Sequence, residues 1–195
     1  MQYPNGIKKK IVNINSHSNR GMNLEADLND TNEYYRYNDI AIIYKKPTPI
    51  TINKVDYKSR KDAVIKEAHF KVPSTTDYNG VYKGKYIDFE AKETKSLTSF
   101  PLINVHKHQI DHLENIYKHG GIGFIIVRFI RLNKTYLLFI EDLLNFLNNE
   151  KRVSIPISYF EKNAYVIKEA IRPRLDYLKV IDNKGVELWK SLLKI

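Results

Sequence analysis

One stretch of alternating residues, from Tyr78 to Lys92, restricts the fold more than any other part of the chain. Polar and apolar side chains alternate on both sides of the dipeptide Lys83-Gly84. That dipeptide suits a two-residue hairpin turn, because glycine adopts a positive φ without strain. The pattern therefore predicts two antiparallel strands, with Tyr82 directly opposite Lys85.

This register collects four polar side chains on one face of the predicted hairpin. Opposed residues have a constant sum of residue numbers, which places Asp77 opposite Glu90 and Thr75 opposite Lys92. Opposed residues share a sheet face, and so do residues two apart on one strand. The other face is apolar enough to pack on a core and carries Tyr78, Tyr82, Ile87, Phe89 and Ala91. A slip of one residue would bury the charges, so the register is expected to hold unless a β-bulge interrupts a strand.

Asp77, Glu90 and Lys92 are the residue types of a metal-dependent site that cleaves phosphodiesters. Two carboxylates with Cβ atoms about 5 Å apart repel each other unless a cation neutralises them. Mg²⁺ takes one or two carboxylates together with water and phosphate oxygens, and it lowers the pKa of its bound water. A neighbouring lysine can stabilise the negative charge of the transition state. The alternative is an ordinary polar hairpin face with a solvated charge pair.

A helix is predicted from Val105 to the glycine pair that begins at Gly120. At helical spacing, its inward face carries Val105, Gln109, Leu113, Ile116 and Tyr117. Gln109 is the only polar member of this stripe and needs a partner, which can be a metal site, a phosphate or a backbone group at the edge of the core. His108 and His112 are four residues apart, but no acid or cysteine completes a zinc site. A solvated helix face or a phosphate contact is expected for them instead.

Basic residues dominate the charge of the chain. A net charge of +10 over 195 residues predicts a polyanionic partner. The first acidic residue is Glu25, so residues 1–20 are interpreted as a flexible basic arm, with Arg20 as a nucleic-acid contact. The alternative for this segment is a tail that has no binding role.

A second basic segment lies between the first strands and the hairpin, at about residues 54–72. It has few large apolar side chains, so it is predicted to project from the core as an insertion. Tyr57 and Phe70 are interspersed among its basic residues, a combination that suits phosphate contacts and stacking on exposed bases. The expected nucleic-acid contacts are Lys54, Lys58, Arg60, Lys61, Lys66 and Lys71. A solvated surface loop is the alternative.

The remaining pattern predicts one α/β domain over residues 21–195, with a mixed central sheet flanked by helices. Helices are expected at 23–35, 141–149 and 186–193, and strands at 39–44, 50–55, 122–130 and 135–139. The chain has no cysteine, which excludes disulfides and thiol catalysis. It has no Walker loop, secretory signal or membrane-length apolar run, so ATP use and membrane insertion are not expected and a cytoplasmic location is favoured.

Six blocks of sequence carry a family resemblance: Arg20–Glu25, Asp39–Pro49, Ser74–Tyr82, Tyr86–Lys95, Thr98–Leu102 and Arg172–Leu178. In this order, they resemble the RecU-type Holliday junction resolvases, which belong to the PD-(D/E)xK nuclease superfamily. The resemblance runs from about Arg20 to about Val180. The proline that usually precedes the aspartate in the wider superfamily is Thr76 here, as it is in the RecU-type pattern.

The resemblance implies a role for each residue of the site. Thr75, Asp77, Glu90 and Gln109 match the magnesium-binding positions of the family, and Lys92 matches its transition-state stabiliser, so that Asp77, Glu90 and Lys92 are the expected catalytic residues. The basic insertion matches a stalk that enters the centre of the junction.

The resemblance also implies an activity. It is that of a Mg²⁺-dependent endonuclease that resolves four-way DNA junctions by paired nicks during homologous recombination and DNA repair, leaving 5′-phosphate and 3′-hydroxyl ends. Paired cuts imply a two-fold homodimer. A branch-migration helicase and a recombinase are candidate protein partners. Two alternatives stay open: a junction-binding module without essential cleavage, and a restriction-type nuclease on the same fold.

Overall fold

The structure, a computed structural model, describes residues 23–57, 59, 61–71 and 75–192, with side chains described as far as Gly185. The predicted basic arm, residues 1–20, lies outside the described residues. So do three of the predicted nucleic-acid contacts: Arg20, Lys58 and Arg60.

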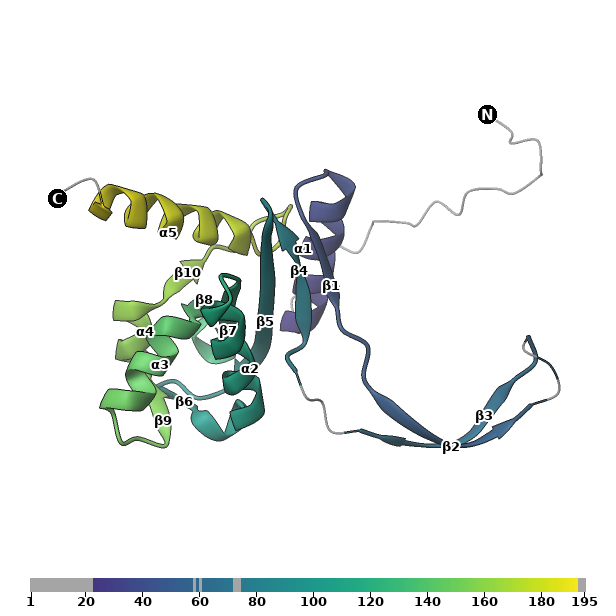
Figure 1. Ribbon diagram of the computed structural model, residues 1–195. Helices are drawn as coiled ribbons and strands as arrows, with labels where there is room; N and C mark the ends of the chain where they lie inside the picture. The colour runs from purple at the N-terminus through teal and green to yellow at the C-terminus, as the bar shows by residue number, and fades with distance from the viewer. Residues whose placement is uncertain (1–22, 58, 60, 72–74, 193–195) are drawn as a thin grey trace.

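A six-stranded mixed sheet forms the centre of the molecule, as the sequence predicts (Figure 1). Its strands, in spatial order, are β1 (Ile42–Lys45), β4 (Tyr78–Tyr82), β5 (Lys85–Thr94), β7 (Ile122–Phe129), β8 (Lys134–Phe139) and β10 (Tyr165–Ile167). Strands β5 and β7 run parallel, and all other neighbours in this sheet are antiparallel. Two further sheets of two strands each pair β2 (Ile50–Asp56) with β3 (Val64–Phe70) and β6 (Ser99–Pro101) with β9 (Ser154–Pro156).

Helices cover the sheet on both faces (Figure 1). They are α1 (Leu24–Tyr37), α2 (Lys107–Lys118), α3 (Ile140–Asn149), α4 (Ile157–Asn163) and α5 (Tyr177–Leu192), with short 3₁₀ turns at Leu102–Asn104 and Ile130–Leu132. Successive residues of β7 point to opposite faces, so Phe124 and Ile126 pack with α1 and α5, whereas Ile125 and Val127 pack with α2, α3 and α4. Burial on both sides explains why this strand has an almost continuous apolar sequence.

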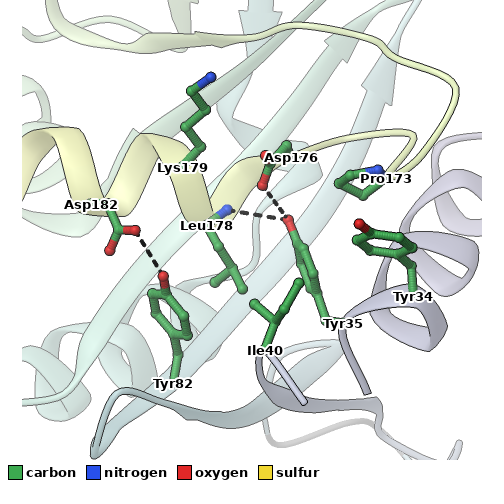
Figure 2. Close-up of a pocket in the computed structure, with 9 residues that line it drawn as sticks. All are labelled: Tyr34, Tyr35, Ile40, Tyr82, Pro173, Asp176, Leu178, Lys179 and Asp182. Atoms are coloured by element: carbon green, nitrogen blue, oxygen red, sulfur yellow. Dashed lines mark hydrogen bonds between the residues drawn. The ribbon is translucent and has the colours of Figure 1, made fainter. Parts of the chain in front are cut away.

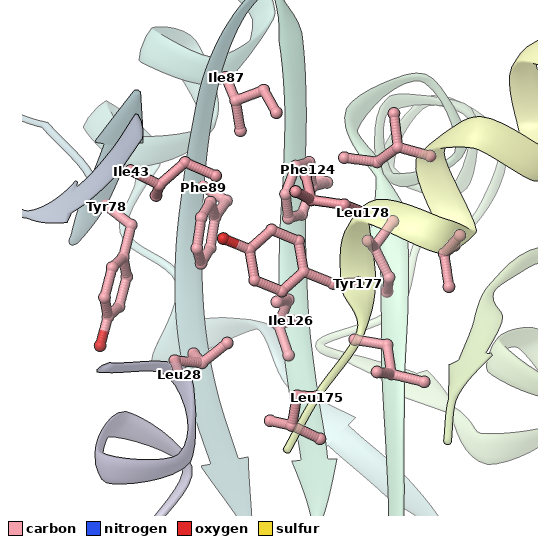
Figure 3. Packing of buried hydrophobic residues seen from close by; sticks show 14 of the residues in the cluster. Leu28, Ile43, Tyr78, Ile87, Phe89, Phe124, Ile126, Leu175, Tyr177 and Leu178 are labelled. Carbon is pink, nitrogen blue, oxygen red and sulfur yellow. The ribbon is translucent and has the colours of Figure 1, made fainter. Parts of the chain in front are cut away.

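The predicted β4–β5 hairpin forms in the expected register, with Tyr78 opposite Phe89 and Tyr82 opposite Lys85. Both turn residues have positive φ, 47° at Lys83 and 73° at Gly84, as a tight hairpin turn requires. The register between the two strands is continuous, without a bulge. The apolar face of the hairpin is buried, and Phe89 stacks on Tyr78 and Phe124 with ring centroids 4.8 Å apart in each pair (Figure 3).

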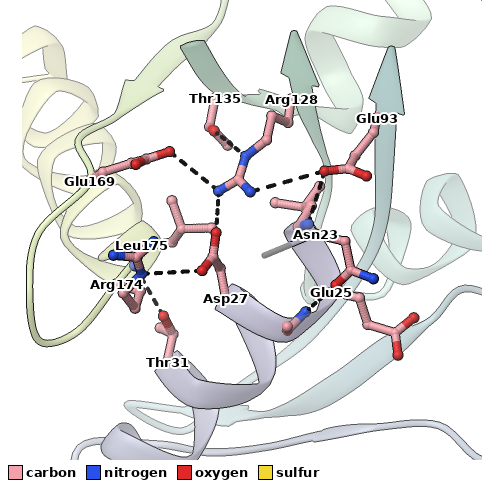
Figure 4. A network of polar contacts seen from close by, with 12 residues as sticks. Asn23, Glu25, Asp27, Thr31, Glu93, Arg128, Thr135, Glu169, Arg174 and Leu175 are labelled. Carbon is pink, nitrogen blue, oxygen red and sulfur yellow. Dashed lines mark hydrogen bonds and ion pairs between the residues drawn. The ribbon is translucent and has the colours of Figure 1, made fainter. Parts of the chain in front are cut away.

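Helix α1 is fixed by its cap and by a buried ionic network. The Asn23 side chain accepts a hydrogen bond from the Ala26 N–H at 2.9 Å and caps the start of the helix. Asp27 is buried between Arg128, at 2.6 Å, and Arg174, at 3.1 Å (Figure 4). This network ties α1 to β7 and to the segment before α5. Its charges compensate one another away from water, so removing a single partner would be costly.

Three predicted boundaries differ from the structure. The first strand begins at Ile42 rather than Asp39, because Asp39 adopts a positive φ of 55° in the turn after α1. The last helix begins at Tyr177 rather than at residue 186, since residues from Tyr177 onward bury apolar side chains against the sheet.

The second predicted helix begins at Lys107, after Val105, and its inward stripe is shorter than predicted. Tyr117 is 46% exposed rather than inward-facing. Its neighbour Ile116 lies against Gly121 instead, so close that a Cβ on Gly121 would be 2.6 Å from the Ile116 Cγ2 atom.

Strands β2 and β3 form a ribbon that projects away from the central sheet (Figure 1). Every residue of both strands is exposed, so the ribbon contributes nothing to the core. It begins at Ile50, ahead of the insertion expected at about residues 54–72. Lys54, Lys61, Lys66 and Lys71 are exposed in and beside this ribbon. Among the helices described, none is both long and apolar enough to cross a membrane.

Candidate active site

Asp77, Glu90 and Lys92 meet beside β5. The Glu90 side chain is fully buried, and its Oε2 atom accepts a hydrogen bond from the Asp77 N–H at 3.1 Å. Its Oε1 atom is 2.5 Å from the Lys92 Nζ atom. Asp77 directly precedes β4 and is half-buried, and the Lys92 side chain is 26% exposed. These contacts join a buried acid, a partly exposed acid and a lysine in one cluster.

The environment of Glu90 disfavours its ionised form. The pKa of its carboxyl is raised from 4.5 to about 7, chiefly by burial and also by the neighbouring Asp77, while the Lys92 ammonium group acts in the opposite direction. A carboxylate without water around it needs positive charge nearby, and Lys92 supplies only part of that charge. A further cation at this place would favour the ionised form of Glu90.

The donor atoms fit a hard divalent cation. Asp77 and Glu90 offer carboxylate oxygens, and the backbone contact shows that the two residues are adjacent. Among the residues described, no cluster of three or more histidines and acids could hold a metal. Two carboxylates are nevertheless the number that Mg²⁺ commonly takes from a protein, because water and phosphate oxygens complete its coordination. Asp77 and Glu90 can therefore hold such an ion as a pair.

Thr75 is not placed as the pairing predicted. The β4–β5 ladder ends at Tyr78, so Thr75 lies in a bend ahead of the strand and does not pair with Lys92. The Asp77 carbonyl instead accepts a hydrogen bond from the Lys46 N–H at 2.7 Å, which draws this segment toward the chain that follows β1. Thr75 is half-buried and immediately precedes Thr76 and Asp77.

Gln109 is buried on α2, as predicted, and its partner is a backbone group. The Gln109 Oε1 atom accepts a hydrogen bond from the His106 N–H at 3.0 Å, which caps the start of the helix. This is the backbone alternative among the partners that the sequence left open. A metal ion bound directly to this oxygen would have to replace the cap.

The sequence reasoning missed a second buried carboxylate, Asp88, on the same sheet face as Glu90. It also missed Lys46, whose Nζ atom is 2.8 Å from Asp88. His112, expected on a solvated helix face or at a phosphate, instead points inward, with its Nε2 atom 3.1 Å from Asp88. Two signals could have revealed this cluster. Asp88 is two residues before Glu90 on one strand, and His112 is three residues after Gln109 on one helix.

A cavity elsewhere in the molecule is separate from these acids. It has a volume of about 290 Å³ and is lined by residues of the α1 and α5 side, including Tyr35, Tyr82, Asp176 and Asp182 (Figure 2). Asp176 accepts a hydrogen bond from Tyr35 at 2.9 Å, and Asp182 accepts one from Tyr82 at 2.8 Å. These contacts join α5 and the residue before it to α1 and β4. None of the predicted site residues lines this cavity.

Comparison with known proteins now identifies the family. Residues 19–183 match the family model described as RecU, Recombination protein U. The chain belongs to the RecU family. A relative named Holliday junction resolvase RecU from Geobacillus sp. strain WCH70 is 51% identical over 192 residues, covering 93% of this chain and 96% of the relative. A second RecU with the same name, from Geobacillus kaustophilus strain HTA426, is 53% identical over 183 residues and covers 92% of this chain and 90% of the relative.

The family resemblance seen in the sequence is thus confirmed over most of the chain. A solved structure of Hjc from Archaeoglobus fulgidus, titled a Holliday junction resolvase, covers 71% of this chain and 89% of its own. Its sequence identity is 11% and its TM-score is 0.41. The RecU assignment therefore depends on the sequence relatives.

Proposed function

We propose that this RecU-family protein is a Mg²⁺-dependent endonuclease that resolves four-way DNA junctions by paired nicks, in homologous recombination and DNA repair. The observation that carries the proposal is the buried Glu90 carboxylate, held against Asp77 and Lys92. The substrate is supported by relatives named Holliday junction resolvase that match this chain over nine-tenths of its length.

Asp77 and Glu90 would hold the cation, which supplies an activated water and a clamp on the scissile phosphate. Glu90 must be ionised for this role, and burial opposes its ionisation. Lys92 compensates the Glu90 charge in the protein alone, through the 2.5 Å contact. The partly exposed Lys92 ammonium group would stabilise the negative charge that develops on the phosphate. The products are 5′-phosphate and 3′-hydroxyl ends.

Thr75 and Gln109 would complete the metal site through water. Thr75 lies two residues before Asp77 and is half-buried, so its hydroxyl would be a further oxygen donor near the pair. Gln109 would contribute the second lone pair of its Oε1 atom, while the first continues to accept the hydrogen bond from the His106 N–H. Such contacts orient the waters without requiring α2 to lose its cap.

The projecting ribbon would bind the four-way junction and recognise its shape. Its exposed lysines provide phosphate contacts, and its exposed Ile52, Tyr57 and Phe70 side chains can contact unstacked bases at the crossover. We assign the same role to Arg20, Lys58 and Arg60, with residues 1–20 as a basic arm and residues 54–72 as the stalk. Each chain carries one acidic pair, so symmetric cuts on two strands call for a homodimer. A branch-migration helicase and a recombinase remain candidate partners.

One experiment separates this function from its alternatives. Purified protein is incubated with a mobile four-way junction and with a linear duplex, with and without Mg²⁺, beside an Asp77→Asn variant. The proposal predicts metal-dependent cleavage of the junction alone, and none by the variant. Equal cutting of the duplex would favour a restriction-type nuclease. Tight junction binding without cleavage would favour a remodelling module.

A further inference from the structure

Asp88 occupies the centre of a polar cluster beside the acidic pair. It lies on β5, two residues before Glu90, and is fully buried. Its Oδ2 atom is 2.8 Å from the Lys46 Nζ atom, 2.9 Å from the Tyr86 hydroxyl and 3.1 Å from the His112 Nε2 atom. Its Oδ1 atom accepts a hydrogen bond from the Thr76 hydroxyl. With four partners and no exposed surface, this carboxylate has little freedom to rotate.

The partners of Asp88 lie in the segments that carry the proposed metal ligands. Thr76 directly precedes Asp77, and His112 is one turn after Gln109 on α2. Lys46 also donates a hydrogen bond from its Nζ atom to the Thr76 hydroxyl at 3.0 Å. Asp88 therefore joins the Asp77 segment and α2 to strand β5, which carries Glu90.

The Asp88 carboxylate also contacts both chain segments that connect the ribbon to the central sheet, which together form the ribbon base. The chain leaves the central sheet at Lys46, runs out along β2 and back along β3, and returns at Thr76, just before β4 (Figure 1). Both of these residues bind Asp88. The Lys46 N–H also binds the Asp77 carbonyl at 2.7 Å, so the ribbon base and Asp77 are held as one unit.

Asp77 depends on these contacts for its position. It precedes β4, where the β4–β5 ladder has already ended, so pairing with β5 does not fix its carboxylate. Its neighbour Glu90 is the second acid of the pair, and two adjacent carboxylates repel each other when both are ionised. Without a restraint, this repulsion would widen the gap into which a cation has to fit.

We propose that Asp88 is a positioning residue. It does not bind the cation, and it holds the Asp77 segment and α2 against β5, so that Asp77 and Glu90 present their oxygens to one divalent ion. This inference rests on the proposed function, because it assumes that Asp77 and Glu90 are the metal ligands. Groups that orient metal ligands typically change metal affinity about 10–100-fold when they are removed.

The chain offers a matched control for the loss of a buried charge. Asp27 is also buried and also ion-paired, with Arg128 and Arg174, but it lies on α1, on the opposite face of the sheet from Asp88. An Asp27→Asn variant removes a comparable buried charge without touching the Asp77 segment. A purely structural role for Asp88 would make the two variants behave alike.

The test is a calorimetric titration of Mn²⁺ into the full-length protein without DNA, with a thermal melt of each variant. We expect Asp88→Asn to bind Mn²⁺ about 10–100-fold more weakly than the unaltered protein. Asp27→Asn should bind Mn²⁺ as the unaltered protein does, even though its melting temperature falls. Should Asp88→Asn fail to fold, Thr76→Val leaves Asp88 in place and removes only the hydroxyl that donates to Asp88 and accepts from Lys46. It is expected to weaken Mn²⁺ binding in the same direction.

Unchanged Mn²⁺ affinity in a folded Asp88→Asn variant, or in Thr76→Val if that is the variant used, would overturn the inference. So would an equal loss of affinity in Asp27→Asn, because general destabilisation would then account for both. Because the titration contains no DNA, its outcome is independent of cleavage. Unaltered protein that binds Mn²⁺ but cuts no junction would refute the proposed function alone, and unaltered protein that binds no Mn²⁺ would refute both.

Discussion

Replacing Glu90 by glutamine should make the metal-free protein more stable at neutral and alkaline pH while it removes a metal ligand. Burial, together with the neighbouring Asp77, raises the pKa of Glu90 from 4.5 to about 7 in the folded protein despite the opposing effect of Lys92. The folded state therefore holds this proton more tightly than the unfolded chain does. The associated stability is fully present below about pH 4.5 and is lost as the pH rises through 7. Above that pH, the folded protein must keep an ionised carboxylate away from water.

The size of this effect follows from the two pKa values. At about 1.36 kcal/mol for each pH unit, moving the pKa from 4.5 to about 7 costs the ionised form roughly 3 kcal/mol. Glutamine has a similar shape and does not titrate. The free energy of unfolding of Glu90→Gln, minus that of the unaltered protein, should thus rise by up to roughly 3 kcal/mol between pH 4 and pH 8. Urea denaturation in the presence of EDTA, at several pH values, measures this difference.

The neighbouring core position provides the control. Ile87→Val removes one buried methyl group and no titrating group. It should lower the free energy of unfolding by about 0.5–1.5 kcal/mol, and by the same amount at every pH. Saturating Mg²⁺ should also reduce the advantage of Glu90→Gln, because the cation stabilises the ionised glutamate. A stability difference between Glu90→Gln and the unaltered protein that does not vary with pH would refute the argument from burial.

Three further predictions concern the hairpin, the ribbon and the reaction. Gly84→Ala should lower the free energy of unfolding by roughly 1–2 kcal/mol, because φ is 73° there although the space around it is open. Gly80→Ala should lower it by more than the roughly 1–3 kcal/mol of ordinary overpacking, since its Cβ would lie 2.0 Å from the Ile42 carbonyl oxygen. Denaturant melts compare these two variants. Replacing Lys54, Lys61 and Lys66 by alanine should leave the stability to denaturant unchanged and weaken junction binding. The slope of log affinity against log salt should become shallower by about 0.9 for each phosphate that the protein no longer neutralises. At limiting Mg²⁺, the cleavage rate should rise with pH through about 7 as Glu90 ionises, and saturating Mg²⁺ should move this midpoint to lower pH.

The hairpin could be predicted from sequence because its constraints are local. Alternation with a period of two and a glycine that tolerates positive φ determine which residues face each other, and the Tyr78–Phe89 pair has the predicted register. The stripe on α2 was predicted well at Leu113, which is fully buried, and poorly at Tyr117, which is 46% exposed. The end of a helix depends on what it packs against, which periodicity alone does not reveal.

The polar cluster around Asp88 was not predicted, because its members are far apart in sequence. Lys46 is 42 residues from Asp88, and His112 is 24 residues from it on another element. Local patterns give the face on which a residue lies, but they do not give the partner that a long-range crossing brings to it. The same limit applies to Gln109, for which the sequence offered a metal, a phosphate or a backbone group, and only the fold showed the His106 N–H as its partner.

The central claim is that Asp77 and Glu90 together form the catalytic metal site, and one comparison tests it most directly. Single-turnover cleavage of a four-way junction in Mg²⁺ is measured for Asp77→Asn and for Asp111→Asn. Asp111 is exposed on α2, where it pairs with Lys107 at 2.8 Å, so its variant makes the same chemical change outside the site. We predict that Asp111→Asn cleaves at the rate of the unaltered protein, whereas Asp77→Asn binds the junction and leaves it intact. Equal cleavage by the two variants would contradict the claim.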